Sequence, residues 1–144
     1  MKTGKPVNLL LVEDDSADVM GIERALKSLK VSNPLTIAND GLEALDHLRG
    51  ENGKEKLQAP YIILLDLNMP RMNGIEFLQE IRKDDELKTA VVFVLTTSSS
   101  DEDKVKAYEQ NIAGYIVKND PTKSFMEAVG LIDYYWSIVE LLDH

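Results

Sequence analysis

Residues 61–70, with the sequence YIILLDLNMP, decide the fold of this chain. The first five are apolar without interruption, which is typical of a strand buried on both faces of a parallel sheet. Asp66 follows directly, and an acid that closes a fully apolar run is seldom found there unless it is paired. This stretch therefore predicts a central strand over residues 61–65 with a functional carboxylate at its end.

The rest of the chain repeats this pattern of strand followed by helix. Apolar runs predict further strands at residues 7–12 and 90–95, and weaker ones at 35–38 and 114–117. Between them, apolar residues recur at steps of three and four, which predicts amphipathic helices. The members of these helical sets are Val19, Ile22, Leu26 and Leu29; Leu42, Leu45 and Leu48; Ile75, Leu78 and Ile81; and Val105 and Tyr108. The order predicts an α/β fold, a doubly wound five-stranded parallel sheet with helices on both faces.

Turn and cap residues mark several boundaries of these elements. Ser100 stands three residues before Asp103, as in a helix cap, and Asp120 precedes Pro121, which suits a first helical position. Residues 50–60 contain two glycines, a proline and several charges, which predicts a surface loop. We expect one domain over residues 1–144, with an extended C-terminal helix over about residues 121–142.

Composition narrows the possible functions. The 144 residues include 16 Lys and Arg against 25 Asp and Glu, a net charge of −9, and no cysteine. Disulfides and thiolate metal sites are excluded, and the negative charge disfavours direct binding to nucleic acid or an anionic membrane surface. The apolar run at 7–12 is too short for a signal peptide, and no run approaches the length of a membrane span. We expect a cytoplasmic protein.

The polar residues that end the strands predict a metal site. Ligands of open α/β sheets bind at the carboxyl ends of the strands, where we place Glu13, Asp14, Asp66, Thr96 and Lys118. Crowded carboxylates need a compensating cation, and hard oxygen ligands without histidine or cysteine favour Mg²⁺ or Mn²⁺. One carboxylate can then act as a nucleophile towards phosphorus, with a hydrogen bond from Thr96 and positive charge from Lys118.

Each of these residues also has an ordinary structural interpretation. Asp14 and Asp15 are as well suited to capping a helix that begins near Ser16 as to binding a metal. The hydroxyl groups of residues 96–100 are also typical of residues that hydrogen-bond within a turn. A single lysine such as Lys118, considered by itself, most often lies in solvent. Asp66 is the exception, because its position after a buried strand favours function over structure.

Four motifs in order resemble the receiver domain of two-component response regulators. They are LLLVEDDSAD at residues 9–18, LLDLNMPRMNG at 64–74, VLTTSS at 94–99 and GYIVK at 114–118. The resemblance covers about residues 7–129, and each motif falls at a strand end expected from the apolar pattern. It implies a flavodoxin-like sheet with strand order 2-1-3-4-5.

The resemblance assigns roles to individual residues. It implies that Asp66 accepts a phosphoryl group from a sensor histidine kinase, while Asp14 ligates Mg²⁺ and Glu13 acts through water. The resemblance also implies that the backbone carbonyl of Asn68 is a Mg²⁺ ligand. The remaining roles are the switch and phosphoryl-binding residues Thr96, Lys118 and Tyr115, and the residues that tune the phosphoryl lifetime, Asn68, Thr97 and Ser98. The chain departs from the family pattern at Asn119, where proline is common, and at Glu13, which is often aspartate.

The C-terminal segment predicts a homodimer. Two adjacent apolar stripes run along it, one through Val129, Ile132, Trp136 and Val139 and one through Leu131, Tyr135 and Ile138. A helix that covers a sheet needs one stripe, and two adjacent stripes make an apolar face too wide for it. Trp136 and Leu142 are therefore expected to stay partly uncovered and to meet a partner. The segment DYYWSIVELL also resembles the tail of the response regulators that serve cyanobacterial phytochromes, which implies a phytochrome-type kinase. We expect a dimer interface of Trp136, Ile132, Tyr135 and Val139; the alternative is a tail that folds back on its own domain.

Two other functions compete with a phosphoacceptor that signals by changing its surface. A Mg²⁺-dependent phosphohydrolase with an aspartyl nucleophile would use similar residues, but it usually needs an acid two residues after the nucleophile, where this chain has Asn68. A dinucleotide-binding fold lacks support, because no G-x-G-x-x-G sequence follows the first expected strand. We therefore expect a signalling protein and not an enzyme.

Overall fold

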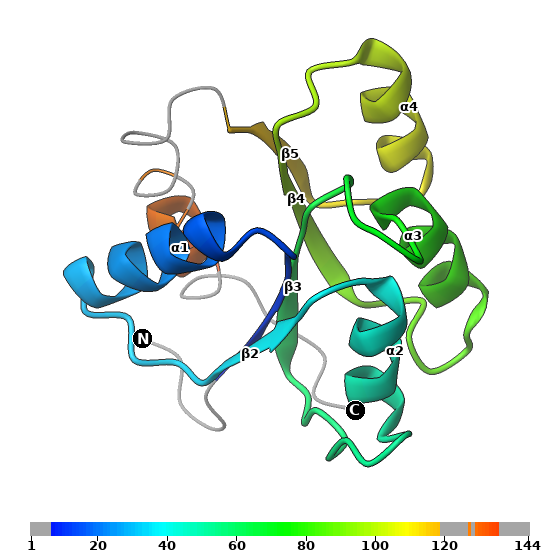
Figure 1. Ribbon diagram of the computed structural model, residues 1–144, viewed down its shortest axis with the longest axis horizontal. Helices are drawn as coiled ribbons and strands as arrows, with labels where there is room; N and C mark the ends of the chain where they lie inside the picture. Colours follow the sequence, from blue (N-terminus) through cyan, green and yellow to red (C-terminus); the bar gives the residue numbers. More distant parts are fainter. Residues whose placement is uncertain (1–6, 119–126, 128, 136–144) are drawn as a thin grey trace.

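The computed structural model describes residues 7–118, 127 and 129–135. Five strands form one parallel sheet in the order β2-β1-β3-β4-β5 (Figure 1). The strands are β1 (Asn8–Val12), β2 (Leu35–Ala38), β3 (Tyr61–Leu65), β4 (Val91–Thr96) and β5 (Gly114–Val117). The predicted doubly wound sheet with strand order 2-1-3-4-5 is confirmed.

Helices cover both faces of this sheet (Figure 1). They are α1 (Ser16–Ser28), α2 (Gly41–Arg49), α3 (Gly74–Lys83) and α4 (Asp101–Glu109), and residues 127 and 129–135 are also helical. Leu10, Ile63 and Val92 point to the face that α2, α3 and α4 cover, and Leu9 and Ile62 point to the face of α1 and the C-terminal helical residues. The central strands β1, β3 and β4 are almost continuously apolar because both of their faces are buried.

Local sequence explains where the helices begin. Asp15 caps α1 by accepting hydrogen bonds from the backbone N–H groups of Ala17 and Asp18, and Ser100 caps α4 through the N–H of Asp103. Asn73 and Glu76 form a reciprocal capping box at the start of α3. The expected cap at Asp120 and the departure at Asn119 lie outside the described residues, whereas residues 50–60 form a loop as expected.

The C-terminal helical residues divide between the core and the surface. Val129 and Ile132 are each only 2% exposed, and Tyr135 packs edge-on against Phe93 with ring centroids 5.2 Å apart. Leu131 and Tyr134 are 52% and 64% exposed. We therefore remove Ile132 from the predicted dimer interface, because its side chain is buried in the core of its own chain. Trp136 and Val139 lie outside the described residues.

Candidate phosphoryl-transfer and metal site

Parallel strands bring the predicted residues to one edge of the sheet. Glu13 follows β1, Asp66 follows β3, and Thr96 is the last residue of β4. Lys118 follows β5, and its backbone N–H donates to the carbonyl oxygen of Thr96 at 2.7 Å. The central strands are aligned at this edge, since Val12 pairs with Leu65 and Thr96 pairs with Val117. The site is thus assembled from segments that are far apart in the sequence.

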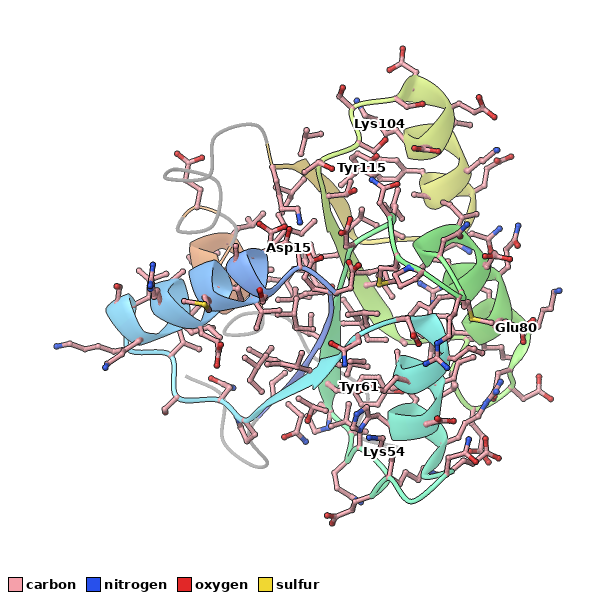
Figure 2. The ribbon with its side chains drawn as sticks, viewed as in Figure 1. Asp15, Lys54, Tyr61, Glu80, Lys104 and Tyr115 are labelled. Atoms are coloured by element: carbon pink, nitrogen blue, oxygen red, sulfur yellow. The ribbon has the colours of Figure 1, made fainter. Side chains whose placement is uncertain are left out.

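Three carboxylates form the acidic part of this site. One oxygen from each of Glu13, Asp14 and Asp66 lies within 4.8 Å of the others. Glu13 and Asp66 are buried, whereas Asp14 is exposed. Asp14 does not cap α1, because Asp15 does so, and the helix-cap interpretation therefore falls to Asp15 (Figure 2).

The charges in this cluster fit a divalent cation. Burial is the main cause that raises the pKa of Glu13 to about 7, and the nearby negative charge of Asp66 adds to it, while the hydrogen bond from Lys118 works in the opposite direction. One ammonium group therefore does not balance the buried acids. An all-oxygen donor set with excess negative charge and one solvent-facing member suits Mg²⁺ or Mn²⁺.

Lys118 lies between three carboxylates. Its ammonium nitrogen is 2.7 Å from Glu13 Oε1 and 2.7 Å from Asp18 Oδ2, but 3.9 Å from Asp66 Oδ2. Burial alone would lower the pKa of Lys118, but hydrogen bonds to Asp18 and Glu13 together with the charge of Asp66 raise it. Lys118 is therefore a charged group held in the site, and the alternative of a solvated surface lysine does not apply.

Thr96 and Tyr115 lie on the side of the site towards α4. Thr96 is fully buried, and its hydroxyl oxygen accepts a hydrogen bond from the N–H of Ser98 at 3.3 Å. The Tyr115 hydroxyl donates to the carbonyl oxygen of Ser98 at 2.9 Å, and the Lys104 ammonium lies 5.9 Å from the centre of its ring (Figure 2). Burial is the first cause that raises the pKa of Tyr115, so the phenol is neutral and donates. These contacts join the end of β4 to β5 and α4.

The loop between β3 and α3 is fixed at both ends. The Asn68 N–H donates to Asp66 Oδ1 at 3.3 Å, and the Gly74 N–H donates to the Leu67 carbonyl oxygen at 3.0 Å. Gly74 has to be glycine, since a Cβ there would lie 2.6 Å from the backbone Cα of Leu67. The side chain of Asn68 is exposed beside this loop, as is that of Thr97 after β4.

A second set of contacts ties the same loop to α2. Arg71 has a positive φ of 60°, and its Nε donates to the buried carboxylate of Asp40 at 2.6 Å. The Gly41 N–H also donates to the Met72 carbonyl oxygen at 3.1 Å. Asp40, the cap of α2, therefore has a second function: it holds the loop that follows the phosphoacceptor candidate.

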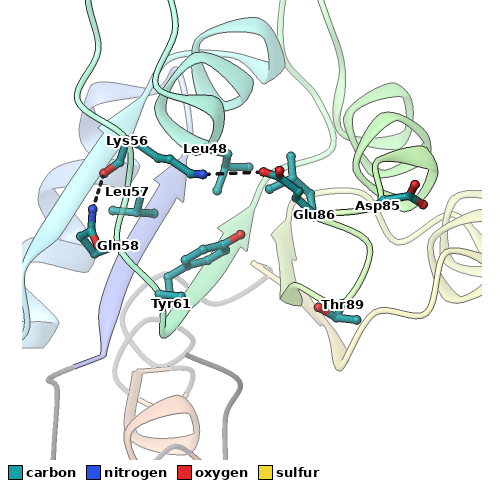
Figure 3. A pocket seen from close by; sticks show the side chains of 10 residues that line it. Leu48, Lys56, Leu57, Gln58, Tyr61, Asp85, Glu86 and Thr89 are labelled. Carbon is teal, nitrogen blue, oxygen red and sulfur yellow. Dashed lines mark hydrogen bonds and ion pairs between the residues drawn. The ribbon is translucent and has the colours of Figure 1, made fainter. Parts of the chain in front are cut away.

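Two cavities differ in their relation to the site. One of about 430 Å³ is lined by Asp14, Leu67, Asn68, Met69, Pro70 and Asn73, and it opens beside the acidic cluster. A larger one, of about 590 Å³, lies where β3 begins, between the loop after α2 and the segment before β4. Tyr61 forms one wall of it, and Lys56 pairs with Glu86 across its rim at 3.6 Å (Figure 3). The first cavity shares Asp14 with the acidic cluster, whereas no residue of the cluster lines the second.

Sequence reasoning missed Asp18, Asp40 and Arg71. Asp18 looks like an ordinary acid in the first turn of a helix, and its contact with Lys118 crosses 100 positions of the sequence. Asp40 and Arg71 stand in unremarkable turn sequences, 31 positions apart. The one sequence feature that suggests an acidic partner for this loop is the positive charge of Arg71, directly after the proline of DLNMP.

The chain belongs to the response regulator receiver domain family, whose profile matches residues 9–130. The response regulator Rcp1 of Synechocystis sp. is 36% identical over 135 residues, which cover 94% of this chain and 92% of that protein. This chain is thus similar in length to a small response regulator of two-component signalling.

Two solved structures share the fold over nearly their full length. The Mn²⁺-bound form of Rcp1 has a TM-score of 0.81 and 34% identity, with 95% of this chain and 99% of that chain covered. The phosphorylated cyanobacterial phytochrome response regulator RcpA has a TM-score of 0.82 and 33% identity, with the same coverage. In the described part of this chain, no helix combines the length and the apolar character needed to cross a membrane.

Proposed function

We propose that the protein is a stand-alone response regulator in which Asp66 accepts a phosphoryl group from a sensor histidine kinase in a Mg²⁺-dependent reaction. The observation that carries this proposal is the place of Asp66, a buried carboxylate within 4.8 Å of Glu13 and Asp14 and 3.9 Å from the ammonium of Lys118. A nucleophile, an anionic metal site and a cation for the phosphoryl oxygens thus meet at one strand end.

In the proposed step, one carboxylate oxygen of Asp66 attacks the phosphorus of a phosphohistidine. An O–P bond forms while the N–P bond breaks, and the imidazole of the kinase leaves. Glu13, Asp14, Asp66 and the backbone carbonyl of Asn68 would hold Mg²⁺ or Mn²⁺, which when bound offsets negative charge on the carboxylates and the phosphoryl oxygens. Lys118 supplies further positive charge from the β5 side of the site.

The change of surface is proposed to run from Thr96 to Tyr115. A phosphoryl group at Asp66 brings new acceptor oxygens, to which Thr96 and Lys118 can donate. Thr96 already contacts Ser98, whose carbonyl oxygen accepts a hydrogen bond from the Tyr115 hydroxyl, so a shift of Thr96 reaches Tyr115 in β5 through two contacts. Asn68, Thr97 and Ser98 border the path of water to the phosphoryl group and are proposed to tune its lifetime.

The proposed partners follow from the same comparisons. RcpA is described as a phytochrome response regulator, and a bacteriophytochrome response regulator, RtBRR, shares 36% identity and a TM-score of 0.77 with this chain. We therefore propose a phytochrome-type sensor histidine kinase as the phosphoryl donor, in the cytoplasm, with no direct contact to nucleic acid or membrane. We also propose a homodimer, whose interface keeps Trp136, Tyr135 and Val139 from the predicted set and adds the exposed Leu131.

The test of the function is labelling at Asp66. Incubation with acetyl phosphate and Mg²⁺ should add one phosphoryl group to the wild type, and Asp66→Asn should abolish the label because the amide is nearly isosteric but not nucleophilic. Asp85→Asn, at an exposed acid far from the site, should be labelled like the wild type. Intact-mass analysis that shows full labelling of Asp66→Asn would refute the assignment, and many turnovers of a phosphomonoester would favour the hydrolase instead.

A further inference from the structure

The ammonium group of Lys118 already uses two of its three N–H donors before any phosphoryl group arrives. Its nitrogen is 2.7 Å from both Glu13 Oε1 and Asp18 Oδ2, which are hydrogen-bond distances, whereas the 3.9 Å to Asp66 Oδ2 is too long for one. Lys118 therefore attracts Asp66 through its positive charge but donates no hydrogen bond to it. To come within hydrogen-bond distance of Asp66, the nitrogen has to move, and this movement lengthens at least one of the two existing contacts.

Burial decides which of the two contacts is given up. The side chain of Glu13 is 2% exposed, so losing Lys118 would leave a buried charge without a partner, which is costly. The side chain of Asp18 is 26% exposed, and water can solvate it after release.

The contact of Asp18 is not needed to begin α1. The N–H of Asp18 is already capped by Asp15 Oδ1 at 3.2 Å, and its carboxylate reaches instead to the residue after β5. An acid in the first turn of a helix is stabilised by the helix dipole even when it points to solvent. The reach across to Lys118 is therefore a separate feature of this side chain.

We propose that Asp18 is a positioning residue that competes with the phosphoryl group for Lys118. In the unmodified protein it holds the ammonium back from Asp66, and on phosphorylation it releases the ammonium, so that the first turn of α1 becomes a part of the protein that changes with the state of Asp66. This inference rests on the proposed phosphoacceptor function. It adds to that function a residue that sets the rate of the reaction and a second surface that reports it.

The experiment compares two acids of the same helix start. Asp18→Asn keeps the size of the side chain but removes the competing charge, and labelling by acetyl phosphate at fixed Mg²⁺ should become about fivefold faster, as expected for loss of a partly exposed ion pair. Asp15→Asn removes the same charge from an exposed neighbour that does not contact Lys118, and asparagine caps a helix as well as aspartate does. Its labelling rate should equal that of the wild type.

Two further measurements separate positioning from a general effect of charge. In a Lys118→Met background, labelling is slower, and adding Asp18→Asn should change its rate no further, because the contact is already gone. In the wild type, beryllofluoride with Mg²⁺ should shift the carboxyl-carbon NMR signal of Asp18 towards that of a solvated aspartate, and in Lys118→Met it should not.

The outcomes distinguish this inference from the function on which it rests. Equal acceleration in Asp18→Asn and Asp15→Asn, or no acceleration in Asp18→Asn while the wild type is labelled at Asp66, would overturn the role of Asp18 alone. Labelling that persists in Asp66→Asn would overturn the proposed function itself.

Discussion

At the scale of single residues, the two neighbouring acids after β1 have different tasks. Asp15 caps α1 through two backbone N–H groups, whereas Asp14 contributes an oxygen to the acidic cluster. The sequence alone gave no reason to separate them, because both stand directly before the helix. The geometry separates them by direction: one faces the helix start and the other faces Asp66.

This division predicts opposite effects for the two residues. Asp14→Asn should lower Mg²⁺ affinity at least about tenfold, the loss typical of disturbing a metal's ligands, and leave the free energy of unfolding of the metal-free protein unchanged. Asp15→Ala should cost about 1 kcal/mol of that free energy by loss of the cap and leave Mg²⁺ affinity unchanged. Titration calorimetry and urea denaturation measure the two quantities, and unaltered Mg²⁺ affinity in Asp14→Asn would contradict its role as a ligand.

At the scale of elements, Arg82 of α3 connects the C-terminal end of α4 with the segment before β4 through hydrogen bonds. Its guanidinium donates to the carbonyl oxygens of Gln110 at 2.6 Å and Asn111 at 3.1 Å, which follow α4, and to those of Lys88 and Ala90 before β4. The last carbonyls of a helix have no partner within it, so this one side chain satisfies groups that would otherwise need water. The C-terminal end of α4 is thus held by contacts from α3.

Removing this guanidinium should loosen α4 as a unit. Arg82→Met keeps the apolar stem but removes all four of these hydrogen bonds, and we expect a loss of about 2 kcal/mol in the free energy of unfolding. Amide hydrogen exchange should become faster at the C-terminal end of α4 and at residues 110–112. Lys83→Met, at the exposed next position of α3, is the control and should leave both quantities unchanged.

The junction of α2 and α3 should be sensitive to acid. Burial alone would raise the pKa of Asp84, but hydrogen bonds from the backbone of Glu86 and from Arg49 lower it below its ordinary value of 3.8. The folded state thus favours the charged form, so this stabilisation is complete above that value and is lost as the pH falls below it. The difference in unfolding free energy between pH 7 and pH 3 should be smaller in Asp84→Asn than in the wild type. In Asp85→Asn, next to it but exposed, the difference should stay as in the wild type.

At the scale of the whole molecule, exposed apolar residues on the C-terminal helical segment predict association. Leu131 faces outwards while Val129 and Ile132 fill the core, and we propose that this exposed side of the segment meets a second chain. Leu131→Glu should convert the proposed dimer into a folded monomer in light scattering. Met20→Glu, at a similarly exposed residue of α1, should remain dimeric; a wild type that is monomeric at high concentration would refute the proposal.

The sequence predicted the sheet better than the contacts between side chains. Continuous apolar runs reveal strands buried on both faces, and the expected strands 35–38, 61–65 and 114–117 agree with the structure residue for residue. β4 lies one residue further along than expected and includes Thr96, because its backbone continues to pair with Val117. Because the predicted strand ends were nearly right, the sequence alone was enough to place Asp66, Glu13 and Lys118 in one site.

Contacts that depend on the rotation of a helix about its axis could not be predicted from the sequence. Asp18 meets Lys118 only because α1 turns that face towards β5, and the apolar pattern of α1 does not specify the rotation to that accuracy. Ile132 shows the same limit: two apolar stripes were visible, but which of them covers the sheet depends on how the helical segment packs.

The pairing of Lys118 with Glu13 joins positions 105 residues apart, and it has a consequence for the biosynthesis of the protein. A nascent chain emerging from the ribosome presents Glu13 and Asp66 long before β5 has been made. Until the last strand docks, the acids lack their ammonium partner and a phosphoryl donor meets an incomplete site. With the proposed function, the capacity to be phosphorylated would be acquired only when the sheet is complete, and partly synthesised chains would not compete with finished ones for the kinase.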